Sequence, residues 1–361
     1  MSDGLAGIVA AETRLSHVDG EAGRLIYRGH RLEELAGRAS FEAVAGLFWE
    51  GLAPGPQDEA SIRSALGQAR LRAASIAAPL LPATTGLAPI EGLRLLLAAL
   101  GDGEAMPPHV LATGAMPVFV AALARQRAGL LPLMPDEKLG HAADFLRLLR
   151  GTSAADAHCR ALETYLVTVM DHGLNASTFT ARVVASTRAG LFSAIVAALC
   201  ALKGPLHGGA PGPVLDMLDA IGDEAGIDGW LAAAIDEGDR LMGFGHRVYR
   251  VRDPRADVLK AVAIDLRDNA NRIRFAETVE RRALALLAQR KPGRRLDTNV
   301  EFYTALVLEA LALPRDLFTS VFAIGRAAGW AAHSLEQEQH GRLIRPQSAY
   351  IGPMPAFALA G

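Results

Sequence analysis

Three short segments of the sequence place histidine, arginine and carboxylate side chains beside glycines, where they could do chemistry. The segments are Gly204-Pro-Leu-His207-Gly-Gly, Gly243-Phe-Gly245-His246-Arg-Val-Tyr-Arg250 with Asp253-Pro-Arg255 after it, and Asn299-Val-Glu301-Phe-Tyr303. Glycine allows a close approach of backbone to a ligand. Carbanion chemistry on an anionic substrate needs a base for the proton, neutral donors for the enolate oxygen and arginines for carboxylates. Together the three segments supply all of these groups.

Taken one at a time, these residues also have structural explanations. A histidine at a helix end, such as His207 or His246, is often only a cap or a partner of the helix dipole. The Asp253-Pro-Arg255 step is typical of a helix start, because proline suits the first turn. A single glutamate among apolar residues, such as Glu301, is more often on a helix surface. The functional interpretation therefore depends on the combination.

Several other kinds of site are not indicated. The sequence has no G-x-G-x-x-G after a strand, no G-x-x-x-x-G-K-[ST] and no H-E-x-x-H. His333 and His340 lie near two glutamates and could be read as a metal site, but composition favours a solvated helix face. The two cysteines, Cys159 and Cys200, have no partners at ligand spacing, so neither a disulfide framework nor a zinc site is expected.

Composition and charge restrict the class of protein. The chain has 361 residues, of which 50% are hydrophobic and 21% charged, as in soluble globular proteins. Its net charge of −2 provides no general attraction to nucleic acid or membrane. The apolar stretch from Leu191 to Leu202 is shorter than the roughly 20 residues that a membrane span needs. No signal peptide is recognised at the N-terminus, so a cytoplasmic location is expected.

Hydrophobic periodicity predicts an all-α protein. In the segment 41–51, Phe41, Val44 and Phe48 share one helix face, with Ser40 as N-cap and Gly51 as C-cap. Further helices are predicted over 59–74, 110–129, 137–150, 154–170, a stretch ending at Ser186, 189–203, 213–221, 228–239, 254–268, 273–290, 299–312 and 315–338. Alternating patterns and β-branched runs that favour strands are nearly absent.

The order of the segments resembles that of the citrate synthase family over nearly the whole chain. The matching segments are Tyr27-Arg-Gly29, Phe41-Glu-Ala-Val44, Asp171-His172-Gly-Leu-Asn175-Ala-Ser-Thr178-Phe, Gly204 to Ala210, Gly243 to Arg255, Asn299 to Tyr303, Ala323 to His333 and Arg345-Pro346. The resemblance implies an all-helical fold with a large domain, 1–212 and 313–361, into which a small domain, 213–312, is inserted. It also implies a homodimer with the active site between the domains, and no metal or redox cofactor.

The resemblance implies two substrates, oxaloacetate and an acyl-CoA, with oxaloacetate held by basic side chains. At the matching positions His172, His246, Arg255 and Arg326 would bind it, and Arg345 would complete the site of the partner subunit. His246 would also polarise the ketone and then protonate it.

The resemblance assigns a second group of residues to acyl-CoA. His207 would donate a hydrogen bond to the acetyl carbonyl, and Glu301 would take the methyl proton. Contacts to CoA would include the backbone at Gly243 and Gly245, with Arg250 on a phosphate. The condensation product would then be hydrolysed to citrate and CoA.

Three departures from the usual family pattern bear on the acyl group. Glu301 stands where the family usually has Asp, and the extra methylene moves the carboxylate by roughly 1.5 Å, a misplacement that can cost about 100-fold in rate. Thr304-Ala305 replaces Ser-Gly, and Gly173 replaces a common Glu. Acetyl-CoA is the expected substrate. The alternatives are a 2-methylcitrate synthase using propionyl-CoA, and a catalytically weak paralogue that only binds and regulates.

Overall fold

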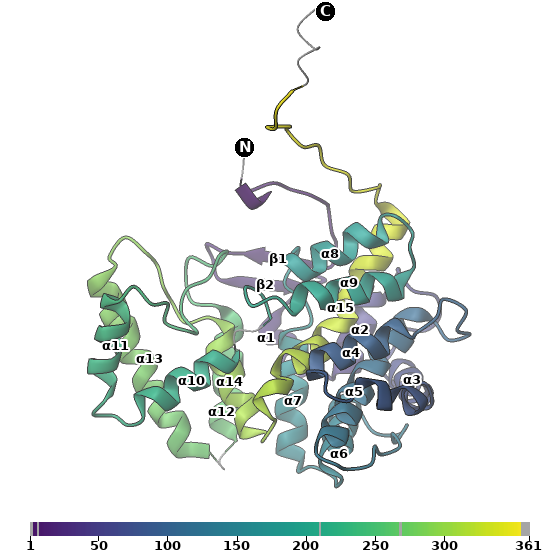
Figure 1. Ribbon diagram of the computed structural model, residues 1–361, viewed down its shortest axis with the longest axis horizontal. Helices are drawn as coiled ribbons and strands as arrows, with labels where there is room; N and C mark the ends of the chain where they lie inside the picture. Colours follow the sequence, from purple (N-terminus) through teal and green to yellow (C-terminus); the bar gives the residue numbers. More distant parts are fainter. Residues whose placement is uncertain (1–2, 6, 209–210, 267–268, 355–361) are drawn as a thin grey trace, which may run out of the picture.

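The structure is a computed structural model that describes residues 3–5, 7–208, 211–266 and 269–354. Within these ranges it is built almost entirely from helices, with one small sheet near the N-terminus (Figure 1). The predicted all-α class is therefore confirmed. The positions Gly209 and Ala210, at the end of the first catalytic segment, lie outside the described residues.

The elements follow one another along the chain in this order. They are η1 (Asp3–Leu5), β1 (Ser16–Asp19), β2 (Arg24–Tyr27), β3 (His30–Arg31), α1 (Leu32–Leu35), α2 (Phe41–Trp49), α3 (Glu59–Leu80), η2 (Leu81–Thr84), α4 (Pro89–Ala98), α5 (Pro108–Arg127), α6 (His141–Arg150), α7 (Asp156–Thr168), α8 (Ala176–Ala185), α9 (Leu191–Leu202), α10 (Pro211–Ile221), α11 (Ile227–Asp236), α12 (Pro254–Asp265), α13 (Ala270–Arg290), α14 (Val300–Ala310), η4 (Arg315–Leu317) and α15 (Phe318–His340).

Local sequence signals placed many helix ends correctly. The Ser40 side chain accepts the Ala43 N–H at 3.1 Å, so it caps α2 as predicted. Gly51, just beyond this helix, has a φ of 72°, the left-handed conformation that ends helices. Asn175 caps α8 by accepting the Thr178 N–H at 3.1 Å. These caps are local in sequence, which is why the sequence alone reveals them.

The structure differs from the predicted pattern at several places, of which four are described. The sheet was missed because its strands are at most four residues long and join as a simple antiparallel meander, too short to show alternation. Helix α4 was also missed. Helix α3 continues through Pro79 to Leu80, since the exposed carbonyl that proline leaves free at Ser75 can bind water. Helix α6 begins at His141, four residues later than predicted.

Two long helices form the buried frame of the molecule. Helix α5 has the length and the apolar composition of a membrane-spanning helix. Most of it is nevertheless buried inside the protein, as in the core helix of a soluble protein. Helix α15 is buried over most of its length and packs against α5, α7, α8 and α9. In Figure 1 helices α10 to α14 gather on the left of the view, and α2 to α6 lie on the right.

A glycine on α15 allows this helix to approach the chain segment that follows α7. A Cβ at Gly329 would lie 2.2 Å from the carbonyl oxygen of Met170, a distance that no real contact tolerates. Gly325, one turn earlier, faces Val169 and Leu166 in the same manner. The contact therefore requires glycine at Gly329, and it places α15 directly beside the residues that precede His172.

Replacement of Gly329 by alanine tests this contact. The added methyl would push the two backbones apart, so we expect Gly329→Ala to lower the free energy of unfolding by at least about 2 kcal/mol. Gly229→Ala is the matched control, because Gly229 lies on α11 with open space around it. The control should raise stability by about 0.5–1 kcal/mol. Urea unfolding measures both, and equal effects would contradict the close contact.

Candidate active site

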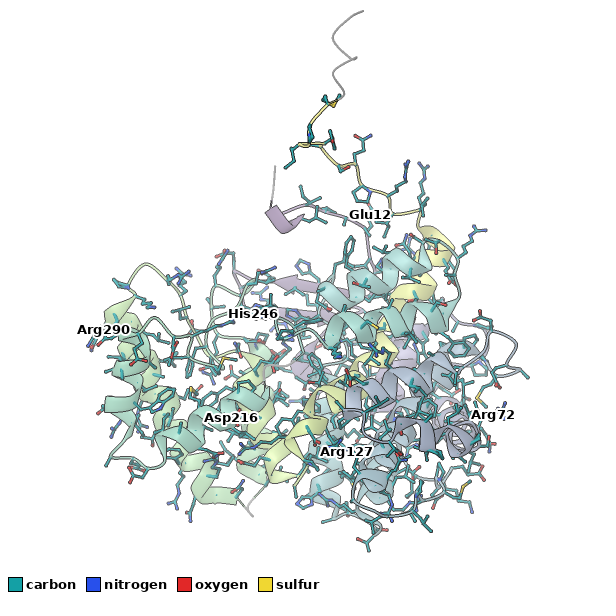
Figure 2. The ribbon with its side chains drawn as sticks, in the orientation of Figure 1. Glu12, Arg72, Arg127, Asp216, His246 and Arg290 are labelled. Atoms are coloured by element: carbon teal, nitrogen blue, oxygen red, sulfur yellow. The ribbon has the colours of Figure 1, made fainter. Side chains whose placement is uncertain are left out.

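Most of the predicted site residues, from five parts of the chain, are brought together in the structure. The ring of His172, just after α7, lies 5.3 Å from the ring of His246, which Figure 2 labels. The Nη2 atom of Arg255 lies 3.4 Å from Nε2 of His246. Arg326 interacts electrostatically with His172, His207 and Glu301.

Backbone groups determine the tautomer of His246. Its Nδ1 atom accepts hydrogen bonds from the N–H groups of Val248 and Tyr249, both at 3.0 Å. Burial, reinforced by Arg255, lowers its pKa to about 4, so the ring is neutral near pH 7. The proton of the neutral ring must then lie on Nε2. Nε2 and the Arg255 guanidinium are two donors beside one another, an arrangement that suits a carbonyl or carboxylate oxygen.

The tautomer of His207 is determined in the opposite sense. Its Nε2 atom accepts the backbone N–H of Ser177 at 3.3 Å and lies 2.8 Å from the hydroxyl of the same residue. The indole of Trp330 donates to that hydroxyl at 3.2 Å, which orients the serine. Burial and then Arg326 lower the pKa of His207 to about 4. The ring is therefore neutral, with its proton on Nδ1 available as a donor.

Glu301 has the properties of a general base. It lies in the first turn of α14, where the Asn299 side chain accepts its N–H at 3.0 Å. Its carboxylate makes no hydrogen bond or ion pair within the described part of the chain. Burial raises its pKa to about 7, although Arg255 and Arg326 act in the opposite direction. A carboxylate that titrates near neutrality is matched to proton transfer at physiological pH.

Arg255 is held in place by a buried carboxylate. Asp253 accepts its Nε at 3.0 Å and its Nη2 at 2.8 Å, and both side chains are at most 4% exposed. Asp253 also accepts the N–H of Val300 at 3.2 Å, so it ties the starts of α12 and α14 together. Burial opposes the charge of Arg255, but the adjacent Asp253 outweighs it and raises the pKa above the usual arginine range. The guanidinium thus stays charged and oriented.

Arg326 combines full burial with an incomplete set of partners. Its Nε donates to the Val169 carbonyl at 2.6 Å, and its guanidinium lies 4.9 Å from the centre of the Phe322 ring. Its Nη1 is buried without a partner in the described residues. Burial lowers the pKa of Arg326 below its usual value. A buried arginine with an unpaired N–H fits a site for a carboxylate, which would satisfy it.

The glycine loop is docked on the segment that leads into α14. Gly243 and Gly245 have φ angles of 84° and 79°, which favour glycine. Gly245 N–H donates to the Asp297 carbonyl at 2.7 Å, and Asn299 N–H donates to the Gly243 carbonyl at 2.9 Å. A Cβ at Gly243 would lie 2.8 Å from the Phe302 side chain. The loop backbone is therefore placed close to Glu301.

Two predicted residues are not brought together with the rest. The side chain of Arg250 is exposed, and only its backbone N–H is engaged, with the Gly20 carbonyl at 2.8 Å. Arg345 is exposed in the C-terminal tail, which extends away from α15 in Figure 1. In this single chain Arg345 contributes nothing to the site.

Sequence reasoning missed several residues that support the site, and it misplaced His333. The Tyr249 hydroxyl lies 3.3 Å from Nε2 of His172. His333 and Glu336 are buried, so the expectation of a solvated helix face is wrong for both. The reason is that α15 is covered on all sides. A signal was present, because His333 lies three positions after Trp330 and seven after Arg326, on one helix face.

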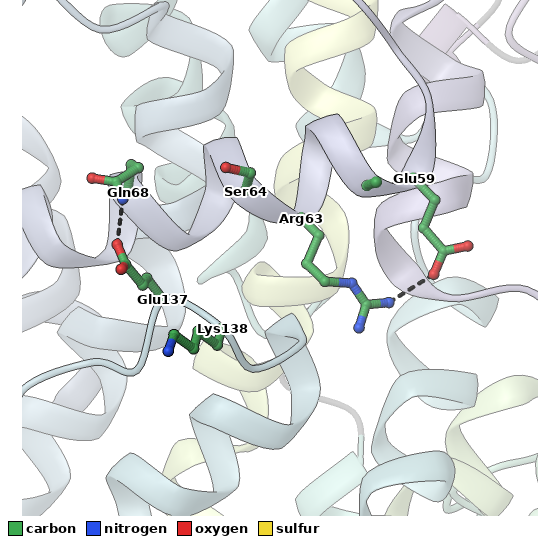
Figure 3. A pocket seen from close by; sticks show the side chains of 7 residues that line it. Glu59, Arg63, Ser64, Gln68, Glu137 and Lys138 are labelled. Carbon is green, nitrogen blue, oxygen red and sulfur yellow. Dashed lines mark hydrogen bonds and ion pairs between the residues drawn. The ribbon is translucent and has the colours of Figure 1, made fainter.

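A hollow on the surface of α3 is not a rival site. Its lining residues are Glu59, Ala60, Arg63, Ser64, Gln68, Glu137 and Lys138 (Figure 3). Arg63 already pairs with Glu59 at 2.6 Å, and Gln68 donates to Glu137. Four of the lining side chains are thus paired with one another, and none of the predicted site residues lines this hollow. In the described part of the chain, no group of three or more His, Cys, Asp or Glu side chains could hold a metal ion.

An all-helical protein that gathers neutral histidines, buried arginines and a carboxylate of raised pKa has the groups of a carbon–carbon condensing enzyme. Comparison with known proteins points to one family. Residues 4–347 match the family model "Citrate synthase, C-terminal domain". Citrate synthase from Haloferax volcanii is 38% identical over 369 residues, covering 97% of this chain and 95% of the relative.

Solved structures agree. Citrate synthase from Thermotoga maritima has a TM-score of 0.88 at 34% identity, covering 98% of this chain and 97% of that one. The same coverage and TM-score, at 29% identity, hold for the Thermoplasma acidophilum citrate synthase in a ternary complex with carboxymethyl coenzyme A and oxaloacetate. The chain belongs to the citrate synthase family. It is an enzyme of the transferase type, and its reaction is the condensation of acetyl-CoA with oxaloacetate to citrate.

The raised pKa of Glu301 predicts a pH-dependent stability difference. Its folded pKa of about 7 exceeds the ordinary 4.5, so ionisation costs stability: the penalty is absent below 4.5, grows up to about 7 and then stays constant. Glu301→Gln removes the charge, so we expect this variant to be more stable than the wild type at pH 8, by up to about 3 kcal/mol. The difference should disappear near pH 4.5. Urea unfolding at both pH values measures it, and a less stable Gln variant at pH 8 would show that the carboxylate is paired.

Proposed function

We propose that Glu301, His207 and His246 carry out the condensation. The observation that supports this most directly is the combination of one carboxylate of pKa about 7 with two neutral histidines of opposite tautomer. Each group is then in the protonation state that its step requires. The ternary complex of the Thermoplasma relative, with an acyl-CoA analogue and oxaloacetate, supports the same pair of substrates here.

The chemical steps follow from these protonation states. Glu301 removes a proton from the acetyl methyl group, and the Nδ1–H of His207 donates to the thioester oxygen on which negative charge develops. The resulting enolate carbon attacks the ketone carbon of oxaloacetate. The Nε2–H of His246 donates to the ketone oxygen and passes its proton to it, so that oxygen becomes the hydroxyl of the product. The proton that Glu301 removed from the methyl group then returns the His246 ring to its neutral form, and both side chains regain their starting states. Water then cleaves the thioester and releases CoA and citrate.

Oxaloacetate is proposed to bind at two buried arginines and the buried His172. His172, Arg255 and Arg326 surround the position beside His246, and the unpaired Nη1 of Arg326 supports a carboxylate there. The backbone of Gly243 and Gly245 and the side chain of Arg250 are proposed to contact CoA. The proposal assigns every step to side chains, with no metal or redox cofactor, and retains a cytoplasmic location.

The acyl group is proposed to be acetyl. Relatives from Haloferax volcanii and from Bacillus subtilis, 38% and 36% identical, are named citrate synthase and citrate synthase 2. These names do not favour 2-methylcitrate synthesis from propionyl-CoA. The neutral histidines and the raised pKa of Glu301 also disfavour a weak regulatory paralogue, which would have no use for a base.

The proposed domain division is a large domain, 1–212 and 313–361, and a small domain, 213–312. Arg255 and Glu301 belong to the small domain, whereas His172 and Arg326 belong to the large one. Oxaloacetate, a dianion, would be held by residues of both domains. It would therefore draw the two domains together and exclude water. The division is supported by the grouping of α10 to α14 on one side in Figure 1.

Glu301 is tested by variants that separate charge from shape. Glu301→Gln keeps the shape but cannot accept a proton, so kcat should fall by at least about 100-fold, with oxaloacetate affinity little changed. In the wild type, kcat should rise with pH through about 7, because the base acts only when ionised. Steady-state CoA release from acetyl-CoA and propionyl-CoA measures these effects. Near-native turnover by the Gln variant would eliminate Glu301 as the base.

Glu301→Asp probes the longer side chain. If the backbone is set back to suit glutamate, the Asp variant should also be slow, and a faster Asp variant would show that it is not.

A homodimer that shares Arg345 is the final part of the proposal. Its support is the exposed Arg345 in a tail that leaves the body of the chain (Figure 1). Arg345→Ala and His207→Ala should each be inactive alone. Mixed subunits should recover activity, because one of the two sites in a hybrid dimer contains neither change. Hybrid formation is confirmed by differently tagged subunits, and hybrids without activity would contradict sharing.

A further inference from the structure

A chain of buried polar groups leads from α15 to the backbone around His172, and the mechanism above does not use it. At its centre His333 is fully buried. Its Nδ1 lies 3.0 Å from Nη1 of Arg182, and its Nε2 lies 3.2 Å from Oδ1 of Asp171, also fully buried. Arginine can only donate, so Nδ1 must accept, and the ring proton lies on Nε2. The protonated nitrogen of His333 therefore lies beside the Asp171 carboxylate, in a close electrostatic contact that lacks the alignment of a hydrogen bond.

Asp171 holds the backbone on both sides of His172. Its Oδ2 accepts the N–H of Gly173 at 3.0 Å and the hydroxyl of Ser16. The hydroxyl of Tyr27 donates to the Asp171 carbonyl at 2.7 Å and accepts the Asp171 N–H at 3.2 Å. Burial opposes the charge of Asp171, but His333, Arg326 and Ser16 outweigh it, so its pKa is lowered. The carboxylate is thus a charged clamp on a short segment that carries one site residue.

On the other side of His333, the series of buried polar groups ends at partners inside the protein and not in solvent. Arg182 donates to Glu336 at 2.6 Å, to Gln337 at 2.9 Å and to the Glu12 carbonyl at 3.2 Å. Glu336 in turn accepts the N–H of Arg14 at 2.8 Å. Both partners of His333 are therefore immobilised, so its ring cannot turn without breaking a buried contact.

We propose that His333 is a positioning residue for oxaloacetate: through the Asp171 clamp it holds His172 in the orientation that receives the substrate. The inference rests on the proposed role of His172. His333 touches neither substrate, so its effect reaches the reaction only through affinity for oxaloacetate. Buried groups that orient metal-ligating histidines affect affinity or activity by about 10–100-fold, and we take the same size of effect as the expectation for His172.

The test compares two variants of His333 whose amide side chains differ in length. The Gln side chain in His333→Gln can place a donor near the position of Nε2, whereas that of His333→Asn is too short to reach Asp171. By titration calorimetry with oxaloacetate alone, we expect His333→Asn to weaken binding at least about tenfold and His333→Gln to remain within about threefold of wild type. The KM for acetyl-CoA, measured at saturating oxaloacetate, should change less than twofold in both. Ser334→Ala, the next position on the same helix, is the matched control and should bind normally.

The outcomes separate this inference from the proposed site. Native affinity in His333→Asn, or equal weakening in both amides with equal loss of melting temperature, would overturn the positioning role. If the Asn variant does not fold, Ser16→Ala removes a donor from the same carboxylate without touching α15: selective loss of oxaloacetate affinity supports the clamp, and no loss overturns it. His172→Asn is measured alongside. Native oxaloacetate binding in that variant would instead refute the role of His172 itself.

Discussion

The site depends on the close contact between α15 and the segment that follows α7. Gly329 allows the two backbones to approach, because any side chain there would collide with the Met170 carbonyl. On the same helix face, Arg326 donates to Val169 and His333 reaches Asp171. One helix thus controls three successive backbone positions before His172. A helix has 3.6 residues per turn, so residues at positions 326, 329 and 333 point in nearly one direction.

Burial of the individual side chains also determines the protonation of the site. The same desolvation lowers the pKa of His207 and His246 to about 4 and raises that of Glu301 to about 7, because it disfavours whichever form carries charge. The histidines become neutral donors and the glutamate becomes a base. Arg255 keeps its charge in spite of burial because the paired Asp253 raises its pKa. One physical cause therefore sorts the residues into acids, bases and fixed charges.

Much of the fold and of the site could be predicted from particular residues. Ser40 could be recognised as a helix start because a cap and its partner are three residues apart. The segments that carry the histidines, arginines and carboxylate could be found because each is short and continuous. The strands β1 and β2 were not predicted because four residues are too few to show a period, and α4 was not predicted either. His333 was misjudged because the neighbours that bury α15 come from distant helices.

The sequence by itself determined the helical class, the caps of α2, the family and the set of candidate side chains, since all of these depend on local patterns. Only the tertiary structure decided the tautomer of His207, the raised pKa of Glu301 and the link from His333 to the site. The reason is distance along the chain. The Arg326–Val169 and Arg182–His333 contacts join residues 157 and 151 positions apart. Such contacts, and the loss of water around them, exist only once the chain has folded.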